Sequence, residues 1–169
     1  MRKRIIGYSL VFIVFYLLDA VFVPIKIFGI GPCFLLSAVV SIAMVEKERF
    51  GAIYGLVFGL FLDFTASSVF GVNAVTFMII GYLVGITVYQ KISVSAVGAF
   101  FLTFVSTVAA ECIIGCLYAF FTSELINDVF IYIVFPKTVL TVPTVIITYP
   151  IIRFMGKLFS RHEEREGIW

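Results

Sequence analysis

Four ionisable side chains interrupt long apolar stretches of this sequence and are its first candidates for chemistry. They are Asp19, Asp63, Glu111 and Lys137. If these stretches are membrane helices, a rise of ~1.5 Å per residue places all four at or beyond the membrane midplane, towards the same surface. Charged groups at such depth usually face the protein interior and find partners. We therefore predict a buried polar cluster, in which Lys137 pairs with one or more of the carboxylates.

This cluster has two interpretations. One is structural, in which the charges form an ion pair or reach to the membrane interface; the other is functional, in which they form a ligand, proton or partner site. Small and polar residues at helical spacing accompany the charges on two faces, formed by Thr103, Thr107, Glu111 and Gly115, and by Lys137, Thr141, Thr144 and Thr148.

Other reactive groups are scarce. His162 lies in a charged tail, where we expect it to be solvated. Cys112 and Cys116 are four residues apart, but no histidine or further cysteine joins them, so a packing role is favoured over metal binding. The sequence has no phosphate-binding loop, serine–histidine pair or zinc motif. We predict no catalytic residue, no metal site and no cofactor, and the short loops disfavour a membrane enzyme such as a lipid-modifying transferase.

The composition indicates that this chain is embedded in a membrane. Of its 169 residues, 62% are hydrophobic and 13% are charged, whereas a soluble domain carries about 25% charged residues. The sequence therefore predicts a single integral membrane domain over residues 1–169. The net charge of +2 gives no indication of nucleic-acid binding, because the basic residues lie at the ends of the apolar stretches.

Six apolar stretches predict an all-α, six-span bundle, because only helices satisfy the backbone of such a chain in lipid. The predicted spans are about 5–23, 30–45, 50–65, 70–89, 95–121 and 129–152, followed by a cytoplasmic tail at 153–169. The first span resembles a signal peptide but lacks a small-residue cleavage site. The second is short for a crossing that needs about 20 residues. A four-span arrangement with a re-entrant second or third segment therefore stays open.

The lysines and arginines predict the orientation. Ten lie in the N-terminus, two turns and the tail, all on one side of the six-span arrangement, whereas Lys26 is the only one on the opposite side. The ten are Arg2, Lys3, Arg4, Lys47, Arg49, Lys91, Arg153, Lys157, Arg161 and Arg165. Because positively charged loops stay in the cytoplasm, both termini are predicted to be cytoplasmic.

Glycines at helical spacing mark the segment from Phe50 to Tyr89. They are Gly51, Gly55 and Gly59 before a polar turn, and Gly71, Gly81 and Gly85 after it. In lipid, small residues let two helices approach closely. We expect a tight helical hairpin, whose glycines serve either packing within the bundle or docking of a partner helix.

Three prolines lie seven residues apart in the last predicted span, at positions 136, 143 and 150. Proline interrupts the hydrogen bonding of a helix, so this span is predicted to be kinked or loosened. Broken membrane helices can also line a binding site when their polar face is turned inward.

Part of the glycine pattern resembles the MreD family of rod-shape-determining membrane proteins. The resemblance is carried by Gly55-x3-Gly59-x3-Asp63, then by Gly71 and by Gly81-Tyr82-Leu83-x-Gly85. Asp19 with Pro24 and Pro32, the chain length and the six-span layout fit the same family.

The resemblance implies a non-enzymatic subunit of the bacterial inner (cytoplasmic) membrane. It implies an elongation complex that supports peptidoglycan synthesis and cell shape, with MreC, MreB, RodA and a class B penicillin-binding protein as partners. The leading hypothesis is a scaffold that binds the single transmembrane helix of a partner. The family provides no catalytic residues to carry over, and a homo-oligomer stays open.

A second family gives the alternative function. MreD proteins look distantly like the S components of energy-coupling-factor vitamin transporters, which are six-helix bundles with a ligand pocket on the outer side. That alternative predicts a pocket lined by Asp19, Asp63, Glu111 and threonines. S components typically carry an Ala-x-x-x-Ala motif in the first helix, and the first predicted span here has none. Likeness of fold alone does not assign function.

Overall fold

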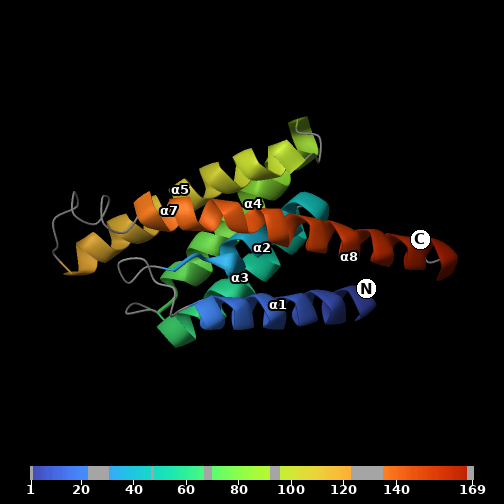
Figure 1. Ribbon diagram of the computed structural model, residues 1–169, viewed down its shortest axis with the longest axis horizontal. Coiled ribbons are helices and arrows are strands. Elements are labelled where there is room, and N and C mark those ends of the chain that lie inside the picture. The colour runs from blue at the N-terminus through green and yellow to red at the C-terminus, as the bar shows by residue number, and fades with distance from the viewer. Residues whose placement is uncertain are drawn as a thin grey trace.

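The computed structural model describes residues 2–22, 31–46, 48–66, 70–91, 96–122 and 135–166, and these are almost entirely helical (Figure 1). In chain order the helices are α1 (Arg2–Phe22), α2 (Phe34–Glu46), α3 (Glu48–Ala66), α4 (Val72–Lys91), α5 (Ala96–Thr122), α7 (Phe135–Thr141), the 3₁₀ turn η3 (Val142–Thr144) and α8 (Val145–Glu166). The all-α prediction therefore agrees with the described part of the chain.

The helices fall where the apolar stretches predict them, with three differences. Residues 31–33 are not helical, so α2 begins at Phe34. Residues 129–134 of the predicted last span lie outside the described residues. The predicted tail continues α8 as a helix as far as Glu166. The first turn of α1 and the last turn of α8 lie at the same end of the molecule (Figure 1).

Helix α2 is the centre of the molecule. It packs against α1, α3, α4, α5 and α8, and every side chain from Phe34 to Met44 is buried. A helix that is apolar on all sides requires such surroundings. With 13 residues α2 is about 20 Å long, which is shorter than the ~30 Å hydrocarbon layer of a membrane.

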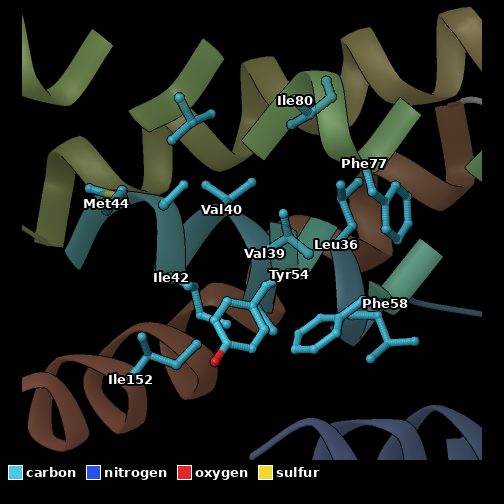
Figure 2. Close-up of a cluster of buried hydrophobic side chains, with 14 of the residues drawn as sticks. Leu36, Val39, Val40, Ile42, Met44, Tyr54, Phe58, Phe77, Ile80 and Ile152 are labelled. Carbon is cyan, nitrogen blue, oxygen red and sulfur yellow. The ribbon is translucent and has the colours of Figure 1, made fainter. Parts of the chain in front are cut away.

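The apolar core is built around α2 by large side chains from its neighbours. Figure 2 shows Val39 and Leu36 of α2 close to Tyr54 and Phe58 of α3, with Phe77 of α4 on the other side. All of these side chains are buried. Close packing of this kind fixes the lateral position of each outer helix.

Aromatic rings join α1 to α3. The rings of Tyr8 and Tyr54 meet edge to face with centroids 5.3 Å apart, and Phe12 lies 4.7 Å from Phe58. Phe12 also contacts Phe61, at 4.8 Å between centroids. Tilted and edge-to-face arrangements are the favoured geometry of such pairs. Bulky rings therefore hold α1 against the hairpin, in contrast to the glycine contacts within it.

The last apolar stretch is broken, as its prolines predict. Pro143 lies in η3, which separates α7 from α8, and Pro150 lies inside α8. A proline within a helix removes one hydrogen bond and clashes with the preceding turn. The break divides this stretch into a short α7 and a long α8 (Figure 1).

Candidate functional site

Glu111 and Lys137 form an ion pair between α5 and α7. Lys137 Nζ lies 2.8 Å from Oε1 of Glu111, and the two side chains are 24% and 3% exposed, respectively. Glu111 lies in the middle of α5 and is the one charged residue of that helix. Removing Lys137 would leave the buried carboxylate of Glu111 uncompensated, which is strongly destabilising.

Asp19 caps the buried start of α2. Its Oδ1 accepts a hydrogen bond from the backbone N–H of Phe34 at 2.7 Å, and its Oδ2 accepts one from Leu35 at 3.2 Å. The hydroxyl of Thr141 accepts a third bond, from the N–H of Cys33 at 3.1 Å. The first N–H groups of a helix have no partner within it. Here α1 and α7 supply the missing acceptors.

These contacts bring three helices together around the first turn of α2. We call Asp19, Glu111, Lys137 and Thr141 the Lys137 cluster. Lys137 pairs with Glu111, while Asp19 and Thr141 both accept N–H groups at the start of α2. Of the four ionisable residues singled out by the sequence, the structure therefore places three in one group.

Asp63 has a different setting, in which it caps α4. Its Oδ2 accepts bonds from the N–H groups of Gly71 and Ala74, both at 3.0 Å. Its Oδ1 accepts from the backbone N–H and the side-chain amide of Asn73, at 3.2 and 2.9 Å. The Asp63 contacts that the structure describes thus close the α3–α4 turn, and none of them joins the Lys137 cluster.

A row of hydroxyl groups joins α2 to η3 and α8. Ser37 hydrogen-bonds Thr144, and Ser41 Oγ lies 3.4 Å from Thr148 Oγ1. All four side chains are buried. The threonines belong to a stripe that the sequence analysis identified, but Ser37 and Ser41 were missed. The missed signal is their spacing of four, which matches that of Thr144 and Thr148 on the facing helix.

The polar stripe of α5 also faces the interior. Thr103, Thr107, Glu111 and Gly115 are all buried. Thr107 donates to the carbonyl oxygen of Thr103 at 2.7 Å, the usual way in which a threonine hydroxyl is satisfied within a membrane helix. Helix α5 packs against α2, α4, α7, η3 and α8.

The glycines of α3 are used inside the bundle. A methyl group added to Gly51 would lie 2.5 Å from the carbonyl oxygen of Gly81, and one added to Gly59 would lie 2.5 Å from Ala74 Cα. Gly55 is equally close to the backbone of Phe77. These distances are far below van der Waals contact, so the backbones of α3 and α4 touch. The sequence left two uses open for the glycines, packing within the bundle and docking of a partner helix. At Gly51, Gly55 and Gly59 the contacts favour packing within the hairpin.

The remaining predicted glycines differ from one another. Gly71 has a φ of +94° at the hairpin turn, a conformation that side chains disfavour. Gly85 is buried on α4. Gly81 faces Gly51, as described above.

Residues 3–159 match the family described as rod shape-determining protein MreD. The chain belongs to the MreD family. The match covers all of the helices described above except the last part of α8 and the first residue of α1. The comparison with curated proteins gave no match, and neither did the comparison with solved structures.

Membership of the MreD family agrees with the helices as membrane elements. By length and composition alone, two described segments can cross a membrane, namely Val97–Leu117 and Phe135–Leu158. Three shorter apolar helical segments accompany them, Gly7–Asp19, Phe34–Glu46 and Val72–Val88. In this chain the short central helix α2 is surrounded by the longer helices α1, α3, α4, α5 and α8.

The described residues of this MreD-family chain hold no group of three or more histidine, cysteine or acidic side chains that could bind a metal ion. Cys33 is buried, whereas Cys116 is exposed and Cys112 lies between these extremes. The described contacts of the site are helix caps, an ion pair and a row of hydroxyls, and each of them joins neighbouring helices.

Proposed function

We propose that this chain is a non-enzymatic membrane subunit of the bacterial cell-elongation complex. In this role it binds MreC and supports peptidoglycan synthesis and the maintenance of cell shape. The observation that carries the proposal is the match of residues 3–159 to the MreD family, whose members are shape-determining membrane proteins. MreB, RodA and a class B penicillin-binding protein belong to the same proposed assembly.

The polar contacts support a scaffold rather than an enzyme. Asp19 and Asp63 accept backbone N–H groups, and Glu111 pairs with Lys137. Catalysis by such groups requires a nucleophile or base held within reach of a substrate. Groups that cap helices and link them instead fix the shape of a surface on which other chains can assemble.

The proposed topology has six crossings of the inner (cytoplasmic) membrane and both termini in the cytoplasm. Two observations support it. The start of α1 and the end of α8 lie at one end of the bundle (Figure 1), and ten lysines and arginines belong to the segments assigned to that side, against Lys26 on the other. Helix α2 is too short to span the hydrocarbon layer alone. The backbone N–H groups at its start donate hydrogen bonds to Asp19 and Thr141.

The proposed partner contact lies on the outer, lipid-facing surface of the bundle. The glycines of α3 are not available for it, because they touch the backbone of α4. Large apolar side chains cover the outer surface instead, for example Leu10, Leu17 and Ile53. In lipid, association with the single helix of MreC would depend on packing and on hydrogen bonds between helices.

Depletion of the chain in its native, rod-shaped host tests the proposal. We expect cells to lose their rod shape and to incorporate less new peptidoglycan along the side wall. An Asp63→Ala variant, which loses the cap of α4, should restore shape less well than the parent at equal expression. Depleted cells that keep both their shape and their side-wall synthesis would contradict the proposal. Loss of uptake of a vitamin in those cells would instead favour the transporter alternative.

A further inference from the structure

Tyr82 carries a hydroxyl group on the outer surface of α4. The residue is 47% exposed, and its neighbours on the same side of the helix are the exposed apolar residues Val75, Ile79 and Leu83. Residues three, four and seven positions apart share one side of a helix. These four residues therefore form a single row along α4, which we call the Tyr82 face.

Tyr82 lies at the middle of α4, which crosses the membrane in the proposed topology. It is the eleventh of the 20 residues of Val72–Lys91, so about 14–15 Å of helix separates it from either end. A tyrosine side chain is too short to reach the headgroups over that distance. Tyrosines on the surface of membrane proteins usually lie at the interfaces, where the hydroxyl meets water. The depth of Tyr82 is thus unusual for an exposed tyrosine.

Within the part of the chain that the structure describes, no group forms a hydrogen bond with the Tyr82 hydroxyl. Two other exposed hydroxyls are satisfied by their own helices. Thr87 donates to the carbonyl oxygen of Leu83 at 2.8 Å, and Thr65 donates to that of Phe61 at 3.1 Å. A tyrosine ring holds its hydroxyl too far from its own backbone for such a bond. In hydrocarbon an unpaired hydroxyl is costly, because no water replaces the missing partner.

Building on the proposed function, we propose that the Tyr82 face binds the single transmembrane helix of a partner protein, which presents an oxygen acceptor to the Tyr82 hydroxyl at mid-membrane. An amide or hydroxyl side chain supplies such an acceptor. Because Val75, Ile79 and Leu83 are large, a closely fitting partner helix carries small residues beside the acceptor. In the proposed assembly this helix is that of MreC.

A second copy of the chain fits the Tyr82 face less well. Two copies related by a two-fold axis would bring their Tyr82 hydroxyls to the same depth. One of the two O–H groups would then donate to the other, which would itself have no acceptor. Both copies would also present large side chains to each other, and these keep helix backbones apart. The face therefore favours a helix of a different kind.

Site-specific photo-crosslinking tests the contact directly. The chain carries a photo-crosslinking amino acid in place of Tyr82 or Ile79 and is co-expressed with MreC, and the membranes are irradiated. We expect crosslinks to MreC from both positions. The control is the same amino acid in place of Leu17, which is 56% exposed on α1; there we expect the crosslink to be lost.

Tyr82→Phe removes the hydroxyl and keeps the ring. The dissociation constant of the complex with MreC, measured by energy transfer between labelled proteins in liposomes, should rise about threefold or more. Thr87→Val is the matched control, since it removes a hydroxyl that is already satisfied within α4, and it should leave the dissociation constant unchanged. Both residues are exposed, so both variants should melt at the temperature of the parent.

Two results would overturn the proposal. One is a crosslink from position 82 to a second copy of the chain in place of MreC. The other is a Tyr82→Phe variant that binds MreC as tightly as the parent; MreC binding is then intact, so the proposed function stands and the contact surface is wrong. A parent chain that does not bind MreC at all would refute the proposed function, and this contact with it.

Discussion

Gly51 and Gly81 face each other across the α3–α4 hairpin, and neither has room for a methyl group. The first lies near the start of α3 and the second in the middle of α4. Their backbones are in direct contact, so α3 and α4 form a closely packed hairpin.

Gly55→Ala should destabilise the protein. Its methyl group would meet backbone atoms of Phe77, and backbone atoms cannot move aside as the end of a flexible side chain can. Overpacking costs about 1–3 kcal/mol, which outweighs the gain of up to about 1 kcal/mol from a better helix former. Thermal unfolding in detergent measures the change. Gly31→Ala is the control, since a methyl group there meets nothing within 4 Å, and an equal loss for both variants would contradict the account.

Asp63→Ala should loosen the α3–α4 turn more than Asn73→Ala does. The carboxylate accepts from Gly71, Asn73 and Ala74, whereas the Asn73 side chain donates one of these bonds. Loss of a single helix cap costs about 0.5–2 kcal/mol, and this carboxylate should lie at the upper end. Hydrogen exchange of the first turn of α4 measures the effect. Protection that survives in Asp63→Ala would show that the cap is dispensable.

Asp19→Ala should destabilise α2 although Asp19 belongs to α1. Two N–H groups, of Phe34 and Leu35, would lose their acceptor, and an unsatisfied buried group costs about 1–3 kcal/mol. Asp19→Asn keeps one acceptor oxygen and should lose roughly half as much. Unfolding measurements on both variants provide the test, and equal losses would indicate that the charge, rather than the hydrogen bonds, matters.

The fold was predicted best where the sequence signal is local. Apolar stretches and glycine spacing located the hairpin, because both patterns repeat within a single helix. The prolines predicted a kinked or loosened last span for the same reason, and the structure has the break at η3. The start of α2 was placed less well, since residues 31–33 are apolar or small but not helical.

The candidate site was predicted only in part, because its contacts join distant segments. The sequence showed that Lys137 needs a carboxylate, but only the fold selects Glu111. It also grouped Asp63 with the other charges, whereas its described contacts lie eight to eleven residues along the chain, around the turn. Ser37 and Ser41 drew no attention, because their spacing of four gains meaning only when it is matched with Thr144 and Thr148 on the segment that faces them.

The hydroxyl row between α2 and α8 should contribute modestly to stability. A double-mutant cycle of Ser37→Ala and Thr144→Val isolates the bond between them. We expect a coupling of about 0.6 kcal/mol, the average for hydrogen bonds between membrane helices. A coupling of several kcal/mol would mean that this row, rather than apolar packing, determines the position of α8.

Co-purification with MreC tests the central claim most directly. The chain, tagged at one terminus and expressed at its native level, is isolated from membranes in a mild detergent. Bound proteins and small molecules are then identified by mass spectrometry. The account predicts that MreC is recovered in a constant ratio to the chain. Isolation of the folded chain without MreC, but with a stoichiometric vitamin or other small molecule, would contradict it.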